Sequence, residues 1–141
     1  MEHVPFEQQE LGEAGQVTAP DGSTVRPLLA LPGLGGLARF ELAPGAVSRA
    51  VSHATVQEIW HVVQGSGWMW RCQDGHQEQT ELRPGVTLTV PLGTAFQFRA
   101  DPGGRALHVL AVTMPPWPGT DSEARPETGP WLPTTGRGFG S

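Results

Sequence analysis

The residues best suited to chemistry in this chain are His53 and Glu58, which interrupt two short runs rich in Val, Ile and Trp. β-Branched and aromatic side chains are typical of strands rather than helices. Successive side chains of a strand alternate between its two faces, so Glu58 shares a face with Trp60 and Val62, and His61 points to the other face. A carboxylate on the same face as Trp60 is directed at a core or a pocket. An imidazole and a carboxylate in such a pocket are groups that general acid–base catalysis uses.

The elements that must position these residues are short strands. The 141 residues include nineteen glycines and fourteen prolines, which interrupt the chain too often for long helices. Turn signals recur between runs of strand length, and Asp74-Gly75 is the strongest hairpin signal among them. Besides two strands within 45–67, the expected strands cover 24–31, 37–42, 68–73, 77–82, 86–90, 94–100 and 106–113. This pattern predicts an all-β sandwich or barrel built as one domain.

The two ends of the chain differ from this central part. Residues 1–23 are polar and without clear periodicity, so we expect an N-terminal arm before a barrel that covers 24–114. Residues 115–141 begin with three prolines around Trp117 and continue rich in Gly, Pro and Thr, which predicts an irregular tail. Such a tail is either disordered or lies on the body or on a partner subunit, and the sequence leaves both open.

Composition excludes several classes of function. The net charge is −5, and the nine arginines are dispersed in a chain without lysine, so there is no basic patch for nucleic acid. No stretch reaches the roughly 18 apolar residues of a membrane span. The first thirty residues lack the pattern of a secretory signal. A single cysteine, Cys72, excludes an internal disulfide and fits a reducing compartment. We therefore expect a cytoplasmic protein whose ligand is a small molecule.

The glycines and prolines around the two candidate residues resemble the two motifs of the cupin family. The matching positions are Gly45, His53, Glu58 and Gly65 in the first motif and Gly85, Pro91 and Gly93 in the second. Val51 stands where the first motif has another histidine, while Phe96 and Ala100 stand where the second has a histidine and an asparagine. The resemblance covers about residues 35–115. It implies a single cupin-type double-stranded β-helix, or jelly-roll barrel, with an irregular arm and tail.

The resemblance also implies a metal site, of which two ligands are missing here. His53 and Glu58 are retained, but the side chains of Val51 and Phe96 cannot coordinate an ion. His108 would complete a set with His53 and Glu58 if its strand directed it inward. We expect no full metal site and no cofactor, with a divalent metal on His53, Glu58 and His108 as the alternative.

The family pattern further implies which side chains line the barrel. Counting alternate positions from Gly65 puts Met69 and Arg71 inside, with solvent or a subunit interface as the alternative place for Arg71. An interior guanidinium would pair with Glu58 and lower its pKa, or would bind an anionic group of the ligand. The apolar walls are expected to be Val51, Trp60, Met69, Phe96 and Phe98.

The same count turns Trp68 and Trp70 outward. Two tryptophans on an outward face form a large apolar patch, and such patches mark interfaces. The resemblance implies a homodimer. Packing under the arm or the tail is the alternative explanation.

Together these residues predict a small-molecule enzyme of acid–base type, such as an isomerase, cyclase or dehydratase that acts on a partly apolar carbonyl compound. His53 and Glu58 would handle the proton, and Arg71 would anchor the ligand. One alternative is a metal-dependent oxygenase or isomerase that uses His53, Glu58 and His108. The other is a ligand-binding or structural dimer without catalysis.

Overall fold

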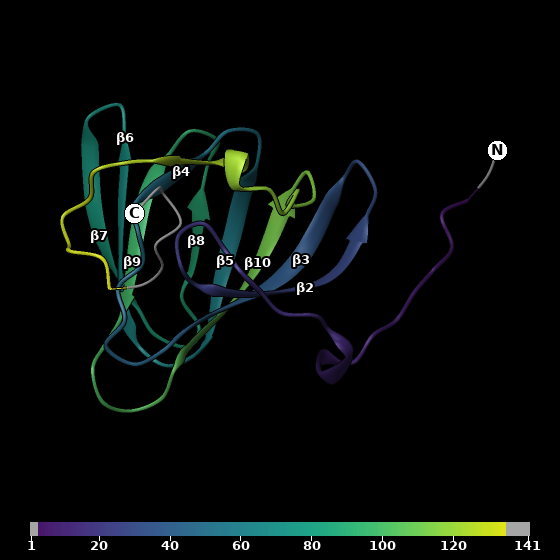
Figure 1. Ribbon diagram of the computed structural model, residues 1–141, viewed down its shortest axis with the longest axis horizontal. Coiled ribbons are helices and arrows are strands. Elements are labelled where there is room, and N and C mark those ends of the chain that lie inside the picture. Colours follow the sequence, from purple (N-terminus) through teal and green to yellow (C-terminus); the bar gives the residue numbers. More distant parts are fainter. Residues whose placement is uncertain (1–2, 135–141) are drawn as a thin grey trace.

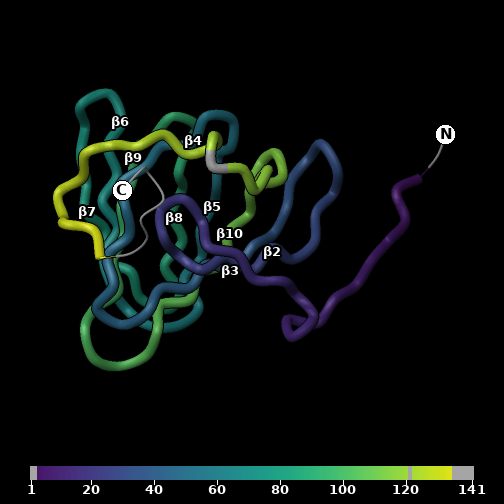
Figure 2. The backbone as a smooth tube through the Cα atoms, viewed as in Figure 1, coloured from purple at the N-terminus to yellow at the C-terminus, as the bar shows by residue number. Residues whose placement is uncertain are grey.

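Two antiparallel sheets packed face to face form the body of the protein in a computed structural model, which describes residues 3–134 (Figure 1; Figure 2). The first sheet, in spatial order, comprises β1 (Val17–Thr18), β2 (Thr24–Leu31), β3 (Gly35–Leu42), β10 (Leu107–Met114), β5 (Gln57–Gln64) and β8 (Thr87–Val90). The second comprises β11 (Ala124–Pro126), β4 (Val51–His53), β9 (Ala95–Ala100), β6 (Gly67–Gln73) and β7 (His76–Leu82). Two single-turn helices, η1 (Leu11–Glu13) and η2 (Asp121–Glu123), complete the elements. The expected all-β architecture is confirmed.

The inner faces of the two sheets form one hydrophobic core around Trp60. Its indole makes edge contacts with three aromatic rings, those of Phe40, Phe96 and Phe98, at centroid distances of 5.1, 5.9 and 5.0 Å. Along β5 the buried and exposed residues alternate strictly, and Glu58 is buried on the same face as Trp60. The face predicted for Glu58 is therefore confirmed, and this strand carries a carboxyl group into the core.

Glycine is required where the backbone turns sharply or two strands come close. Asp74 and Gly75 both have positive φ, 50° and 81°, as the tightest hairpin turns require, and they connect β6 to β7. At Gly67 a Cβ atom would lie 1.9 Å from the carbonyl oxygen of Arg99. No side chain fits there, so Gly67 lets β6 and β9 pair.

Both ends of the chain add a short strand to the sheets. The sequence analysis assigned residues 1–23 to an arm and 115–141 to a tail. In the structure β1 pairs with β2, and β11 pairs with β4, so parts of these segments belong to the barrel. Residues 135–141 lie outside the described part of the chain.

The segment after β11 covers the outer face of the second sheet. Gln97 projects outward from β9, yet it is fully buried, and its amide nitrogen donates to the carbonyl oxygens of Ser48 and Trp131 at 2.8 Å. The Trp131 ring also lies 4.4 Å from the guanidinium carbon of Arg99. Trp70, on the same face, is buried, and its indole N–H donates to Gln77. Packing by the chain's own C-terminal segment thus accounts for part of the face on which the sequence analysis expected an interface.

Replacing Gly129 by alanine should detach this segment. The added Cβ would lie 2.1 Å from Oε1 of Gln97, which its hydrogen bonds hold in place, and 2.9 Å from Cβ of Ala50. Overpacking of this kind costs about 1–3 kcal/mol. In limited proteolysis, the segment that follows residue 126 should be cleaved faster in Gly129→Ala than in wild type. Gly12→Ala is the control, since nothing lies within 4 Å of a Cβ there; equal cleavage of the two variants would contradict the docking.

Within residues 3–134, no helix is long and apolar enough to cross a membrane.

Candidate active site

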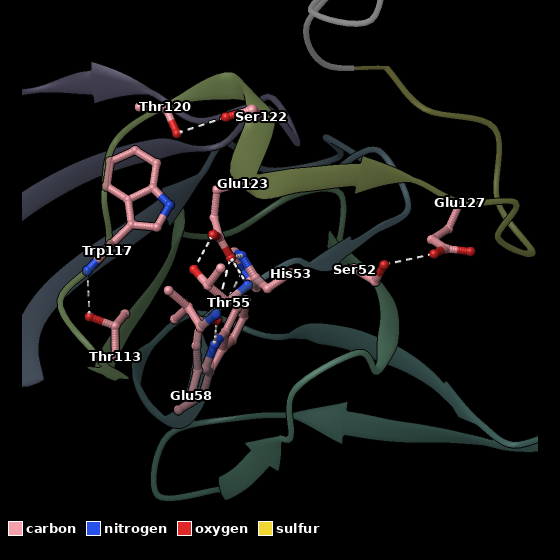
Figure 3. A network of polar contacts seen from close by, with 12 residues as sticks. Ser52, His53, Thr55, Glu58, Thr113, Trp117, Thr120, Ser122, Glu123 and Glu127 are labelled. Carbon is pink, nitrogen blue, oxygen red and sulfur yellow. Dashed lines mark hydrogen bonds and ion pairs between the residues drawn. The ribbon is translucent and has the colours of Figure 1, made fainter.

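His53 lies at the end of β4 with its ring between two carboxyl groups (Figure 3). Its Nε2 is 3.7 Å from Oε1 of Glu58, and its Nδ1 is 3.3 Å from Oε2 of Glu123. The second contact is within ion-pair distance, although its geometry is not that of a hydrogen bond. The ring stacks on Phe96 at a centroid distance of 5.6 Å. An imidazole with a carboxyl group at each nitrogen is an arrangement that can accept and release protons.

Strand pairing brings these groups together from distant parts of the sequence. β4 pairs with β11 so that His53 lies opposite Ala124, and Glu123 is therefore next to the imidazole. Glu58 comes from the facing sheet, where β5 pairs with β10 and places it opposite Thr113. The site thus lies between the two sheets, at the end of the barrel that the C-terminal segment crosses (Figure 1).

Glu58 is the most deeply buried member of the site, with 2% of its surface exposed. Burial raises the pKa of its carboxyl group, and the nearby His53 and a hydrogen bond from the Trp60 indole N–H only partly oppose this. That hydrogen bond, 2.8 Å long, ends on Oε1. Oε2 has no hydrogen-bond partner among the described residues. A carboxyl group with a raised pKa holds its proton to a higher pH than an ordinary glutamate, which suits the role of a proton donor.

Glu123 has the opposite character. Burial alone would raise the pKa of its carboxyl group, but hydrogen bonds from the Thr55 hydroxyl and from the N–H groups of Thr55 and Val56 lower it overall. The two N–H bonds measure 3.0 and 3.1 Å. An ionised Glu123 beside Nδ1 of His53 favours the tautomer with the proton on that nitrogen, so Nε2 is left as the base.

Asp21 is a third carboxyl group near the same imidazole. It is 8% exposed, and burial raises its pKa, although two hydrogen bonds from Ser23 and the charge of His53 act in the other direction. Its Oδ1 accepts from the N–H and the hydroxyl of Ser23 at 2.9 and 2.6 Å. Asp21 precedes a glycine and lies two residues before Ser23, a local pattern that favours a turn. Nothing in that pattern shows that the turn borders the cavity beside His53.

Glu123 was also missed by the sequence analysis. Thr120 to Glu127 is a polar stretch within the expected tail, and its carboxylates look alike in sequence. Only the pairing of β11 with β4 distinguishes Glu123 from Glu127, whose side chain instead accepts a hydrogen bond from Ser52 (Figure 3).

A small cavity of about 20 Å³ adjoins the imidazole. This volume holds about one water molecule. The lining residues are Ala19, Pro20, Asp21, Ser23, Val25, Phe40, Val51, His53, Phe96, Trp117 and Ala124. In this arrangement the cavity is therefore too small for a ligand larger than water, and its walls include residues from the segments 19–23 and 117–124.

The predicted pocket walls divide into two groups. Val51 and Phe96 line the cavity beside His53. Trp60, Met69 and Phe98 are fully buried and form the core beneath it. Phe96 connects the two groups, because its ring contacts both His53 and Trp60.

Arg71 lies on the inner face of β6, as its spacing from Met69 indicates, but its guanidinium binds elsewhere. Nη1 donates to the carbonyl oxygen of Thr89 at 2.8 Å, and Nη2 donates to the Thr80 hydroxyl at 3.0 Å. These bonds join the edge strands β7 and β8 of the two sheets. The charged groups that act on the pKa of Glu58 are His53, Asp21 and Glu123, and the net shift is upward rather than downward. The structure thus gives Arg71 a bridging position and does not bring it to the imidazole.

His108 lies on the outer face of the first sheet, because Leu107 and Val109 on either side of it are buried. Its Nδ1 contacts Nη2 of Arg39, and burial together with the Arg39 charge lowers its pKa. Within residues 3–134, no three His, Cys, Asp or Glu side chains are arranged to hold a metal ion. Val51 and Phe96 occupy two ligand positions of the motifs with buried apolar side chains. The residues present do not fit the metal site that the resemblance implied.

Replacing Glu123 by alanine should destabilise the protein by about 1–3 kcal/mol, because the buried N–H group of Val56 and the partly buried N–H group of Thr55 lose their acceptor. Urea denaturation at neutral pH measures this difference. Glu78→Ala is the control, since this residue is exposed and its contact with His76 is a surface pair of 3.7 Å. If the two variants lost equal stability, the hydrogen bonds from Thr55 and Val56 to Glu123 would not stabilise the fold as expected.

Comparison with known proteins identifies the family. A family model described as Cupin matches residues 9–116. The chain therefore belongs to the cupin family, and the resemblance carried by its two motifs is confirmed. A search of curated protein sequences found no match.

Several solved structures have the same fold at low sequence identity. One is Pac13 of Streptomyces, a nucleoside dehydratase, with 12% identity, a TM-score of 0.67 and coverage of 87% of this chain and 92% of that chain. Oxalate decarboxylase from Bacillus subtilis has 14% identity and a TM-score of 0.69, covering 88% of this chain but 33% of its own. CapF, a capsular polysaccharide assembling protein of Staphylococcus aureus, has 16% identity and a TM-score of 0.63, covering 79% and 33%. These similarities establish the jelly-roll barrel.

Proposed function

We propose that this protein is a small-molecule enzyme that removes water from, or isomerises, a hydroxylated carbonyl compound by acid–base catalysis. The observation that carries the proposal is the pair of opposite pKa shifts on either side of one imidazole. Glu123, with a lowered pKa, lies at Nδ1 of His53, and Glu58, with a raised pKa, lies at Nε2. Groups whose surroundings push their pKa values apart are suited to separate acid and base roles.

In the dehydration, Nε2 of His53 takes a proton from the carbon next to the carbonyl group. The electron pair of that C–H bond forms a carbon–carbon double bond, and the bond from the neighbouring carbon to the hydroxyl oxygen breaks. Glu58 gives its proton to the leaving hydroxyl, which departs as water. The imidazolium is stabilised by the Glu123 carboxylate and returns its proton to Glu58 through solvent. Each proton transfer of this kind contributes about 10²–10⁴-fold in rate.

In an isomerisation the same two groups act without loss of water. His53 removes a proton from one carbon, and Glu58 protonates another. Both reactions require the substrate to present an acidic C–H to Nε2, and they differ only in whether a hydroxyl group lies within reach of Glu58.

Two further features support this class of reaction. The cavity beside His53 is bounded by Val25, Phe40, Val51, Phe96 and Trp117, which suits a partly apolar ligand. The barrel is also similar in fold to Pac13, which is described as a nucleoside dehydratase and has been solved with uridine. We therefore include nucleosides among the substrates to be tested.

Hydrogen exchange in heavy water tests the proposal without knowledge of the product. The wild-type protein is incubated with a panel of β-hydroxy ketones, β-hydroxy acids and nucleosides, and proton NMR follows each compound. We expect loss of the signal from the proton next to the carbonyl group in at least one compound class, with new alkene signals if water is lost. His76→Ala should behave as wild type, since this imidazole is exposed and pairs with Glu78 at the surface.

Two outcomes would contradict the proposal. The first is a folded wild-type protein that exchanges no compound of the panel faster than buffer. The second is stoichiometric iron, nickel or zinc in protein purified without added metal, together with exchange that a chelator abolishes.

A further inference from the structure

A second cavity lies where the free edges of the two sheets meet. β8 is the last strand of the first sheet, and β7, which forms a hairpin with β6, is the last strand of the second (Figure 1). The walls of the cavity come from these three strands and from the turn that follows β8. Its volume is about 110 Å³, and it shares no lining residue with the cavity beside His53. Since a water molecule takes about 30 Å³ in the liquid, a group the size of phosphate or acetate fits this space.

Thr94, at the wall of this cavity, carries a hydroxyl group that the described protein does not use. The residue is 2% exposed, and its Oγ1 has no hydrogen-bond partner among the described residues. A tight turn fixes its position, because its N–H donates to the carbonyl oxygen of Pro91 at 3.0 Å and Gly93 has a positive φ of 79°. A buried hydroxyl without a partner is destabilising, and native proteins keep few of them. This group indicates that a bound molecule supplies the missing partner.

Arg71 brings positive charge and unused donors to the same cavity. Its Nη1 bonds to the carbonyl oxygen of Thr89, and its Nη2 bonds to the Thr80 hydroxyl. A guanidinium carries more N–H groups than these two bonds use, and Nε has no partner within residues 3–134. The two bonds also hold the planar group in place, so that less freedom is lost when a ligand binds. Guanidinium groups recognise the oxygens of carboxylates and phosphates.

The acidic group at this cavity lies on its solvent side. Among the described residues that line the cavity, Glu78 is the only acidic one. Its carboxylate lies 3.7 Å from Nε2 of His76, and both side chains are more than half exposed. Water and salt screen an exposed charge of this kind. At the buried end, beside Thr94, the partly buried Arg71 therefore sets the sign of the charge.

We propose that this cavity binds a small oxyanion, a carboxylate or a phosphate group, between Thr94 and Arg71. One oxygen of the anion accepts a hydrogen bond from the Thr94 hydroxyl, and another accepts from the guanidinium. The anion thereby links the turn after β8 to the β6–β7 hairpin, across the edge where the two sheets meet. The sequence analysis expected Arg71 to anchor the substrate beside His53. In this proposal the guanidinium serves a different ligand, and the site does not depend on the reaction proposed for His53.

Isothermal titration calorimetry tests the site with inorganic phosphate and with acetate, in chloride buffers of constant ionic strength. We expect one of the two anions to bind wild type, and the one that binds identifies the source of the oxygens. Thr94→Val should weaken this binding by about tenfold or more, because a hydrogen bond to a charged group is lost. Thr94→Ser keeps the hydroxyl and should retain the binding. Thr18→Val is the matched control, since this threonine is exposed on β1, and it should bind as wild type does.

Thermal unfolding without the anion separates a ligand site from a structural role. Valine has the shape of threonine but no hydroxyl, so Thr94→Val should have a higher Tm than wild type in chloride buffer, because a buried hydroxyl without a partner has been removed. The anion that binds should raise the Tm of wild type and leave that of Thr94→Val unchanged.

Three results would overturn the proposal. The first is a wild-type protein that binds neither phosphate nor acetate. The second is a Thr94→Val variant that binds the anion as tightly as wild type does. The third is a Thr94→Val variant with a lower Tm than wild type in chloride buffer, which would show that the hydroxyl already has a partner.

Discussion

Replacing His53 by alanine should lower kcat/KM for the exchange reaction by about 10²–10⁴-fold, the usual contribution of a positioned general base. The loss should fall mainly on kcat, because the imidazole acts in proton transfer and the apolar walls of the cavity remain. Steady-state rates with the most active compound of the panel measure it. The side chain of His53 is 10% exposed, and its removal leaves space next to Phe96.

That space allows a direct check of the role of the imidazole. Added imidazole should restore part of the activity of His53→Ala, in proportion to the concentration of its neutral form, and should have no such effect on wild type. A variant that keeps full activity without imidazole would exclude His53 as the base. A variant that unfolds is recognised by its urea denaturation curve, and His53→Gln then takes its place.

The second large effect is expected from Glu58→Gln. Glutamine keeps the shape and the hydrogen bond from Trp60 but has no proton to give, so kcat for dehydration should fall by about 10²–10⁴-fold. Exchange of the C–H proton by His53 should persist. The ratio of dehydration to exchange therefore separates the acid from the base. If dehydration and C–H exchange slowed equally, Glu58 would not act as the proton donor to the leaving hydroxyl.

The same substitution should change the dependence of stability on pH. The pKa of Glu58 is raised in the folded protein above its ordinary value of 4.5, so the folded state holds the proton more tightly than the unfolded state. Its contribution to stability is fully present below pH 4.5 and is lost as the pH rises through the folded pKa. Glutamine stays neutral throughout. As the pH rises above 4.5, the free energy of unfolding of Glu58→Gln, measured by urea denaturation, should therefore increase relative to that of wild type. A difference between the two proteins that stayed constant with pH would contradict a raised pKa of Glu58.

The strands and the facing of their side chains could be predicted because they depend on local signals. Alternation on β5 is set by backbone geometry alone, so the burial of Glu58 and the exposure of His61 follow from sequence. The hairpin at Asp74-Gly75 could be predicted because this pair of residue types readily adopts the positive φ that a tight turn requires, and both residues have it in the structure. Two apolar residues at ligand positions, Val51 and Phe96, were enough to indicate a degenerate metal motif.

The site itself could be predicted only in part, because its remaining members come from distant segments. Asp21 and Glu123 reach His53 through turns whose burial depends on the whole fold. Arg71 has the inward facing that the alternation predicts, but the reach of its long side chain lets it bond Thr89 on the edge of the opposite sheet. Which strand lies within that reach is a tertiary property. His108 could not be placed without knowing which of its neighbours are buried.

The position of Glu123 matters for the proposed reaction. The stretch from Trp117 to Ala124 supplies part of the cavity wall and also the carboxylate beside Nδ1 of His53. A displacement of this stretch that admitted a substrate would also take Glu123 away from the imidazole. For the proposed mechanism, we therefore expect proton transfer by His53 only after the stretch has returned to the position it has in the structure.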